Sequence, residues 1–342
     1  MFTADIPMAH VGPIKICGPH MNEEVNVPLA TYELPLWPST NRGAKISRLA
    51  GGINVVVVDD RMTRSILLEA PNATRAVEMV KDLEQRQDEL ADVIAQTSNY
   101  AKLLDLNSQI VGKLVYLRIE CFSGDASGHN MVTNASQHVM NWLLKQYNDM
   151  QYVSVSANYC TDKKVSAVNG ILGRGKYVIA EVTIPKEMCT NDLRTTAKKI
   201  VDLNTKKNFI GTTLAGGLRT ANAHFANILL AAYLATGQDA ANIIEGSQGI
   251  VYAASQNGDL YFSVTLPNII VGTVGNGKNL NFVQKNLADL GCLAERAPGE
   301  NSTRLAVIIA ATVLCGELSL MAALTNPGEL MRSHILLERK KT

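Results

Sequence analysis

The sequence lacks the features that mark several classes of protein. Its six cysteines form no Cys-x-x-Cys pair, so neither a disulfide framework nor a zinc site of that kind is expected. The 32 basic and 31 acidic residues leave a formal net charge of +1, which gives no overall field for attracting nucleic acid or an anionic membrane. We therefore expect a small-molecule substrate, no nucleic-acid or membrane partner, and only local anion sites.

Long apolar runs are absent too. The longest, Leu305 to Gly316, stops at Glu317 and is shorter than the roughly 20 residues that a membrane-spanning helix needs. It predicts a buried core helix instead. The first residues, MFTADIPMAH, show no basic region followed by an apolar one, and we expect the protein in a reducing cytoplasm.

The composition that is present favours a two-lobed globular protein. At 342 residues with 46% hydrophobic content, the chain can form more than one moderate core. Prolines scattered through residues 1–50 predict irregular and strand-like structure without a long helix. The run INVVVV at 53–58 is typical of a buried strand, and residues 59–64 are interpreted as the turn that ends it.

A smaller lobe is predicted inside the larger one. The order strand, helix, strand, helix, strand fits a compact α/β sandwich, which the chain enters near residue 65 and leaves near 155. The predicted small-lobe elements are a strand at 65–70, a helix with apolar positions between 77 and 94, strand 110–121, helix 132–147 and strand 151–156. Those of the large lobe are strand 177–184, helix 191–204, a helix from 221 that Gly237 breaks, strand 260–271 and a helix to about 290.

Residues 154–169, SVSANYCTDKKVSAVN, concentrate polar side chains between a strand-like run and a run of small residues. Lys163 and Lys164 follow Asp162, so two ammonium groups share one neighbouring carboxylate. At least one is then free to meet an anionic ligand or a developing oxyanion. Adjacent lysines in a turn are more often a solvated loop, and the residues alone leave both interpretations open.

Two glycine-containing loops follow predicted strands. Residues 123–131, SGDASGHNM, could bring backbone N–H groups at a helix start to a phosphate, although the same residues fit a plain strand-to-helix turn. Residues 272–279, GTVGNGKN, nearly match the phosphate-binding loop Gly-x-x-x-x-Gly-Lys-Ser/Thr. Asn279 lacks the hydroxyl that would bind magnesium, so a nucleoside triphosphatase and a metal site are not expected.

Three single residues have two interpretations each. Glu33 beside prolines is normally exposed, but apolar neighbours would raise its pKa, as a proton donor at neutral pH requires. His224 on an apolar helix is more often a core residue than a functional one. His334 lies eight residues from the end of the sequence, where a histidine is usually outside any site.

Together these segments resemble 3-hydroxy-3-methylglutaryl-coenzyme A (HMG-CoA) reductases, from about Pro7 to His334. Residues 154–176 are similar to the family's cis-loop, and PLATYE followed by STNRG resembles the segment with a catalytic glutamate and coenzyme A contacts. Four further segments resemble family segments. DASGHN resembles the dinucleotide-binding motif, and GTVGNG resembles a turn near the nicotinamide. GQDAA resembles the segment with the catalytic aspartate, and Ser333-His334 resembles that with the catalytic histidine of a C-terminal flap.

The resemblance implies an α+β fold with a large substrate domain (1–65 and 155–330), an inserted ferredoxin-like α/β dinucleotide-binding domain (66–154) and a C-terminal flap (331–342). It implies reduction of HMG-CoA to mevalonate with two hydrides from NADPH, or NADH, and release of coenzyme A. It also implies a homodimer or larger even oligomer with shared active sites. The alternatives are an inactive or divergent relative that only binds an acyl-CoA and an oxidoreductase for a different acyl-CoA.

The resemblance also implies residue roles. Lys163 would stabilise the carbonyl oxygen, Glu33 would donate a proton, Asp239 would hold and tune that pair, and His334 would protonate the departing thiolate. The substrate would be bound by Arg64, Ser156, Asp162, Lys164, Lys207, Ser39, Asn41, Arg42 and Asn227. The cofactor would be bound by Ser98, Asn99, Asp125, Ala126, Ser127, Gly128, His129, Asn130, Gly275 and Asn276.

The sequence departs from the family pattern at several of these positions. Ser127 and His129 replace the two methionines of Asp-Ala-Met-Gly-Met-Asn, and Asn276 replaces a glycine. Asn99 stands where NADPH-using relatives carry an arginine, although Ser98 is present, and the cis-loop and flap resemble the NADPH-using branch. The residues around Glu33 also differ, and the sequence begins where the family's upstream helical domain would end.

Overall fold

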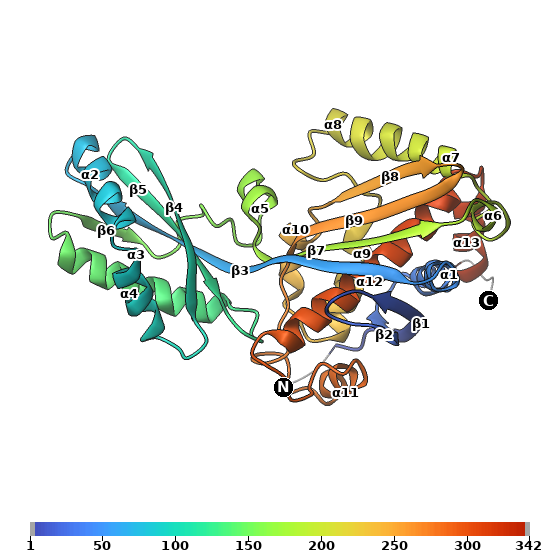
Figure 1. Ribbon diagram of the computed structural model, residues 1–342, viewed down its shortest axis with the longest axis horizontal. Coiled ribbons are helices and arrows are strands. Elements are labelled where there is room, and N and C mark those ends of the chain that lie inside the picture. Colours follow the sequence, from blue (N-terminus) through green and yellow to red (C-terminus); the bar gives the residue numbers. More distant parts are fainter. Residues whose placement is uncertain (1–3, 339–342) are drawn as a thin grey trace.

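One long strand organises the computed structural model, which describes residues 4–338. Figure 1 shows two bodies of helices and strands joined by β3 (Ile53–Glu69), which runs through both. Its first half pairs with β1 (Met8–Cys17) and β7 (Gly175–Ile184), and its second half pairs with β5 (Leu114–Phe122) and β6 (Gln151–Ser154). The two sheets are therefore parts of one hydrogen-bonded network.

The predicted turn at residues 59–64 is wrong. Backbone pairing of β3 continues with β7 as far as Arg61 and with β5 from Met62 onward, so the charged residues remain inside the strand. The predicted full burial of residues 53–58 is also wrong, because Val56 and Val58 are exposed. A strand with one solvated face tolerates charged side chains, since only every second residue must face the core.

The large body has the strand order β2-β1-β3-β7-β9-β8, antiparallel except for the β1–β3 pair. Helices α1, α9 and α12 pack with this sheet around one buried core. The elements not yet given are β2 (Glu23–Ala30), α1 (Leu36–Leu49), α5 (Ala167–Leu172), α6 (Lys186–Asn191), α7 (Ala197–Leu203), the π-helix η1 (Asn204–Gly211), α8 (Thr212–Leu214), α9 (Phe225–Ala235), the 3-10 helix η2 (Ala240–Asn242), α10 (Ile243–Gly246), β8 (Ile250–Gln256), β9 (Asp259–Ile269), α11 (Asn281–Asp289), α12 (Glu300–Leu324) and α13 (Glu329–Glu338).

Three helical regions differ from the sequence expectation. The single helix predicted between residues 77 and 94 is wrong, because residues 73–84 and 87–95 form two separate helices. A 14-residue helix, α1, forms within the proline-rich first 50 residues, because Pro38 lies in its first turn, where a missing N–H breaks no helical bond. The predicted helix 191–204 is replaced by α7 and the π-helix η1. Strand β8 was not predicted.

The apolar run before Glu317 is confirmed as a buried core helix, but α12 extends through that residue to Leu324. It is the one helix among residues 4–338 that is long and apolar enough to cross a membrane, and 94% of its most apolar window is buried inside the protein. Glu317 is fully buried and does not end the helix because its carboxylate accepts the Ala223 and His224 N–H groups.

The small body has the element order β3, α2 (Ala73–Glu84), α3 (Gln87–Ala95), β4 (Lys102–Val111), β5, α4 (His129–Gln146) and β6. Its strands pair antiparallel in the order β6-β3-β5-β4, which is a ferredoxin-like arrangement. The predicted single strand 110–121 is wrong: Gly112, with φ 59°, turns the chain into a β4–β5 hairpin. The predicted α+β class is confirmed.

Candidate active site

The cis-loop, taken from here on as residues 155–174 of the resembling segment 154–176, connects β6 of the small body to β7 of the large body. Three of its non-glycine residues, Asn158, Thr161 and Lys163, have positive φ angles of 61°, 42° and 57°. Left-handed backbone is unfavourable for such residues and is retained where the surroundings hold it in place. Within the loop, the side chain of Asn169 donates to the Thr161 carbonyl.

Lys163 and Asp239 form the central ion pair of the site, with 2.8 Å between the ammonium nitrogen and a carboxylate oxygen. The hydrogen bond to Asp239 raises the pKa of Lys163. Burial is the largest single influence on Asp239 and opposes its ionisation, but the hydrogen bonds from Lys163 and from the Ala241 N–H, together with the charge of Lys163, lower the pKa of this carboxyl. The lysine is therefore held as a cation at neutral pH, beside an ionised partner.

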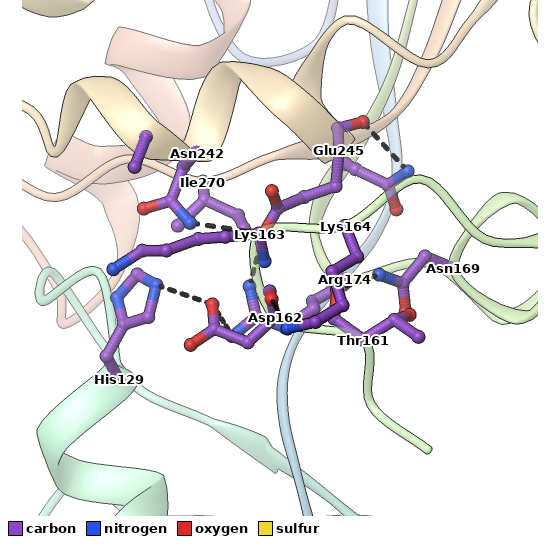
Figure 2. Close-up of polar contacts among 12 residues, drawn as sticks. His129, Thr161, Asp162, Lys163, Lys164, Asn169, Arg174, Asn242, Glu245 and Ile270 are labelled. Atoms are coloured by element: carbon purple, nitrogen blue, oxygen red, sulfur yellow. Dashed lines mark hydrogen bonds and ion pairs between the residues drawn. The ribbon is translucent and has the colours of Figure 1, made fainter. Parts of the chain in front are cut away.

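Charged side chains next to Lys163 form a network with Asp162, Arg174 and Glu245 (Figure 2). Arg174 contacts Asp162 at 3.0 Å and Glu245 at 2.9 Å, and the Glu245 oxygen also accepts the backbone N–H of Lys163 at 3.0 Å. Burial raises the pKa of Glu245. The sequence analysis did not predict a role for Glu245, and it included Arg174 only as part of the segment 154–176. Neither residue has a local sequence pattern that indicates burial.

His129 reaches the same network from the small body. Its ring, at the start of α4, points toward Asp162 in Figure 2, with 3.7 Å between the imidazole Nε2 and the carboxylate. Burial, followed by the charge of Arg174, lowers the pKa of His129 to about 4. The imidazole is therefore neutral at pH 7, and this departure from the family motif places an uncharged ring beside Asp162.

A cavity of about 400 Å³, called here the lysine cavity, gathers Asp162, Lys163 and Asp239 with seven of the ten predicted cofactor residues. Gly275 has φ 96° and open space where a side chain would lie, and the first turn of α4 carries backbone N–H groups without helical partners. These features fit a dinucleotide cofactor, because a helix N-terminus favours phosphate. The cavity is lined by Arg64, Ala126, Ser127, Gly128, His129, Asn130, Met131, Asp162, Lys163, Gln238, Asp239, Val274, Gly275, Asn276 and Lys278.

Lys278, the lysine of the near phosphate-binding loop, lines this cavity. Its ammonium donates to the Gly237 carbonyl at 2.5 Å, and burial lowers its pKa to about 8. The side chain is thus committed to a backbone carbonyl of the large body. Its position argues against the use that a nucleoside triphosphatase makes of this lysine.

A second cavity of about 440 Å³, called here the glutamate cavity, contains Glu33 and His334. One carboxylate oxygen of Glu33 accepts a hydrogen bond from Asn227 at 2.6 Å. Ser39 and Arg42 line the same cavity. The two cavities share no lining residue in the part of the chain that the structure describes. Asp239 contacts Lys163, whereas Glu33 contacts Asn227.

His224 also lines the glutamate cavity and was missed as a functional candidate. Its Nδ1 lies 2.8 Å from the buried carboxylate of Glu317. The sequence interpretation as a satisfied core histidine is therefore half right. The ring has a buried partner, yet it also forms part of the cavity wall.

Several predicted binding residues have other contacts. The carboxylate of Asp125 accepts the N–H groups of Gly299 and Ser302 at the start of α12, at 3.1 and 2.8 Å. Asn41 accepts the Gly12 N–H at 2.8 Å. Neither residue lines the two cavities in the part of the chain that the structure describes.

The remaining predicted residues divide into two groups. Arg64 bonds the Ser156 hydroxyl at 3.3 Å beside the lysine cavity, and the Lys164 ammonium bonds the Asp162 carbonyl at 3.0 Å. Lys207 on η1 bonds Asn208, and Ser98 accepts the Tyr100 N–H in the turn that also holds Asn99. Of these residues, Arg64 lines the lysine cavity, and Ser156, Lys164, Lys207, Ser98 and Asn99 lie outside both cavity linings as described.

Comparison with known proteins decides the family. The sequence model of hydroxymethylglutaryl-coenzyme A reductase matches residues 2–339. The chain belongs to the HMG-CoA reductase family. Among curated HMG-CoA reductases, that of Pyrococcus abyssi is 43% identical over 98% of this chain and 82% of its own length, and reductase 1 of Gossypium hirsutum is 42% identical over 98% of this chain and 57% of its own length.

Solved structures of HMG-CoA reductases share the fold. The class II enzyme of Streptococcus pneumoniae, solved with NADPH bound in open conformations, aligns with a TM-score of 0.73 over 95% of this chain and 86% of its own. At 20% identity, this likeness concerns the fold alone. The resemblance noted in the sequence motifs is thus confirmed by the family match.

Proposed function

We propose that this chain reduces HMG-CoA to mevalonate in a site where the lysine cavity of one protomer meets the glutamate cavity of another. Reduction of HMG-CoA is the reaction of the family to which the chain belongs. The observation that carries the site assignment is the Lys163–Asp239 pair, 2.8 Å apart, in a cavity that the DASGHN motif also lines. The proposal makes this pair the electrophilic half of the site.

Lys163 would stabilise negative charge on the thioester carbonyl oxygen. A reduced nicotinamide, held by the first turn of α4 and by Gly275 and Asn276, would supply the hydride. Asp239 keeps the ammonium protonated and fixes its direction, so little reorganisation is needed when charge develops on the oxygen. Arg64, on the wall of the same cavity, would bind the free carboxylate of the substrate.

Glu33 and His334 would serve the other half of the reaction. Glu33 would donate a proton to the reduced carbonyl oxygen, with its carboxyl held in place by Asn227. His334 would protonate the leaving coenzyme A thiolate, and Ser39 and Arg42 would contact coenzyme A in the glutamate cavity. Because these residues line a different cavity from Lys163, the complete site needs a second copy of the chain, and we propose a homodimer.

The finer assignments are also proposals. NADPH is the proposed cofactor because the S. pneumoniae structure with the shared fold contains NADPH. The proposed substrate domain comprises residues 1–65 and 155–330 and the dinucleotide-binding domain residues 66–154. The proposed flap is 331–342, of which residues 339–342 lie outside the described residues. A cytoplasmic location stays a prediction.

The assay follows oxidation of NADPH, and in parallel NADH, with HMG-CoA as substrate. We expect oxidation that depends on HMG-CoA and falls about 10²- to 10³-fold in Lys163→Ala, as for loss of a donor to a developing oxyanion. Lys285→Ala is the matched control, because Lys285 pairs only with Asp289 on the exposed face of α11 among described contacts. A folded dimer that oxidises neither cofactor would support the binding-only alternative.

A further inference from the structure

Arg174 and Glu245 form a buried ion pair next to Asp162 and Lys163 of the cis-loop. Both side chains are fully buried, and the guanidinium lies 2.9 Å from the carboxylate. Arg174 is the last residue of the cis-loop, between α5 and β7, and Glu245 belongs to α10, so the pair joins the end of the loop to a helix of the large body. Figure 2 shows both side chains next to Asp162 and Lys163.

Each member of the pair binds one of two consecutive loop residues. Arg174 contacts the Asp162 carboxylate at 3.0 Å, and one Glu245 oxygen accepts the backbone N–H of Lys163 at 3.0 Å. The same oxygen accepts the Asn242 side chain at 3.1 Å, next to the end of the segment that carries Asp239. A single buried carboxylate thus connects the backbone of Lys163 to the element that holds its ion-pair partner.

The backbone of Lys163 needs such support. Its φ of 57° is left-handed, and Thr161 and Asn158 nearby are also left-handed. Side chains at such angles persist where surrounding contacts determine them. Without the buried pair, the loop would relax toward more favourable angles and the ammonium of Lys163 would change direction relative to Asp239.

We propose that Arg174 and Glu245 are positioning residues that hold Asp162 and Lys163 in the arrangement needed for reduction. This inference rests on the proposed catalytic role of Lys163. Neither side chain lines the lysine cavity in the described structure, so both act through the residues they hold. Displacement of a reacting group by about 1 Å costs about 10²-fold in rate, which sets the scale of the expected effect.

A purely structural role predicts something different. Replacing both members of a buried ion pair with apolar residues of similar size is often neutral or stabilising, whereas removing one member leaves an unpaired buried charge. The double variant Arg174→Met/Glu245→Met therefore removes the proposed positioning contacts and both charges of the buried pair, and it leaves the partly exposed Asp162 carboxylate without its guanidinium partner. If Arg174 and Glu245 only stabilise the fold, this replacement should leave kcat unchanged. If they position Asp162 and Lys163, kcat should fall.

The experiment measures three quantities on the dimer with NADPH and HMG-CoA. We expect the double variant to unfold within a few degrees of the wild-type temperature, as pair replacement is often neutral. We expect kcat to fall about 10- to 100-fold while KM for NADPH changes less than about threefold. Hydrogen exchange at the Lys163 amide should accelerate at least about tenfold, because its acceptor is lost.

Two further variants sharpen the test. Glu245→Gln keeps an oxygen that can accept the Lys163 N–H, so it should retain more amide protection than the double variant. Lys176→Met/Asp60→Leu is the matched control, because Lys176 and Asp60 form another largely buried pair at 2.8 Å on neighbouring strands and contact no cis-loop residue among their described bonds. Its kcat and its Lys163 exchange should match the wild type.

The inference fails if the double variant keeps wild-type kcat, or if Lys163 exchange is unchanged whatever happens to kcat. If the double variant does not fold, the single variants Glu245→Met and Glu245→Gln are compared instead. Wild-type Lys163 exchange and wild-type kcat in Glu245→Met, equal to those of Glu245→Gln, would overturn the proposal. The proposed function is tested separately: it fails if Lys163→Ala retains wild-type activity. Amide exchange at Lys163 reports on the loop alone, so the two failures can be told apart.

Discussion

The lysine and glutamate cavities are of similar size but are built differently. Lys163 and Asp162 are held by the buried charges of Arg174 and Glu245, and the neutral ring of His129 from the small body lies beside Asp162. In the part of the chain that the structure describes, the Glu33 carboxylate has one hydrogen-bond partner, Asn227, in a cavity whose walls include Pro35, Leu36 and Leu330. Within one chain, the lysine cavity therefore has a network of charged contacts, whereas the glutamate cavity, to which the proposal assigns proton donation, lies apart from it with more apolar walls.

The largest expected effect tests whether the two cavities work in different chains. Glu33→Gln and Lys163→Ala should each abolish most activity, and mixing the two proteins under conditions of subunit exchange should restore it to about a quarter of the wild-type value. That fraction follows because half of the random dimers are mixed and each contains one intact shared site. Activity is measured as NADPH oxidation per site after exchange.

Mixing two separately prepared Lys163→Ala samples is the control and should restore nothing. If the mixed variants stay inactive although subunit exchange is demonstrated, each site is complete within one chain. The division between the two cavities would then have no catalytic meaning.

A smaller effect concerns the charge partner of Lys163. Asp239→Asn removes the hydrogen bond that raises the pKa of Lys163, so kcat should fall about 10²-fold and its alkaline limb should move to lower pH. The sign follows because a lysine with a lowered pKa loses its proton earlier as pH rises. The pH profile of kcat provides the measurement, and an unchanged alkaline limb would remove Asp239 from the proposed role.

In the glutamate cavity, Asn227→Ala should have a more modest effect. Losing the 2.6 Å bond frees the Glu33 carboxylate to move, and we expect kcat to fall about tenfold, within the range for misplacing an acid–base group. Asn222→Ala would not serve as a control because it caps the start of the same helix. Asn301→Ala, whose described bonds lie at the distant start of α12, should keep the wild-type rate.

The smallest effect at neutral pH is expected for His129→Met, which restores the family residue. Burial lowers the pKa of His129 to about 4, below its ordinary 6.5, so the unfolded chain binds the proton more readily. The wild type should therefore lose stability as pH falls from about 6.5 to about 4, by up to roughly 3 kcal/mol, and the variant should lose less. Urea unfolding across this range measures the difference; parallel curves would contradict it.

Much of the site could be predicted because its motifs are short and local. GQDAA, DASGHN and the Asp162-Lys163-Lys164 run each place chemistry within a few residues, and the lysine cavity gathers members of all three. Asp125 shows the limit of this reasoning. A residue inside a binding motif can instead cap a helix far along the chain, because its carboxylate bonds whichever N–H groups the fold brings to it.

The sequence by itself determined the family, the α+β class, the buried core helix and the chemical groups of the site. These properties depend on residue type and on spacing within one segment. Only the tertiary structure decided that β3 continues through its charged residues, that Lys163 pairs with Asp239, and that Arg174 and Glu245 lie next to Asp162 and Lys163. Burial and pairing of charges depend on which distant segments meet, since a charged residue has the same local pattern whether water or a buried partner surrounds it.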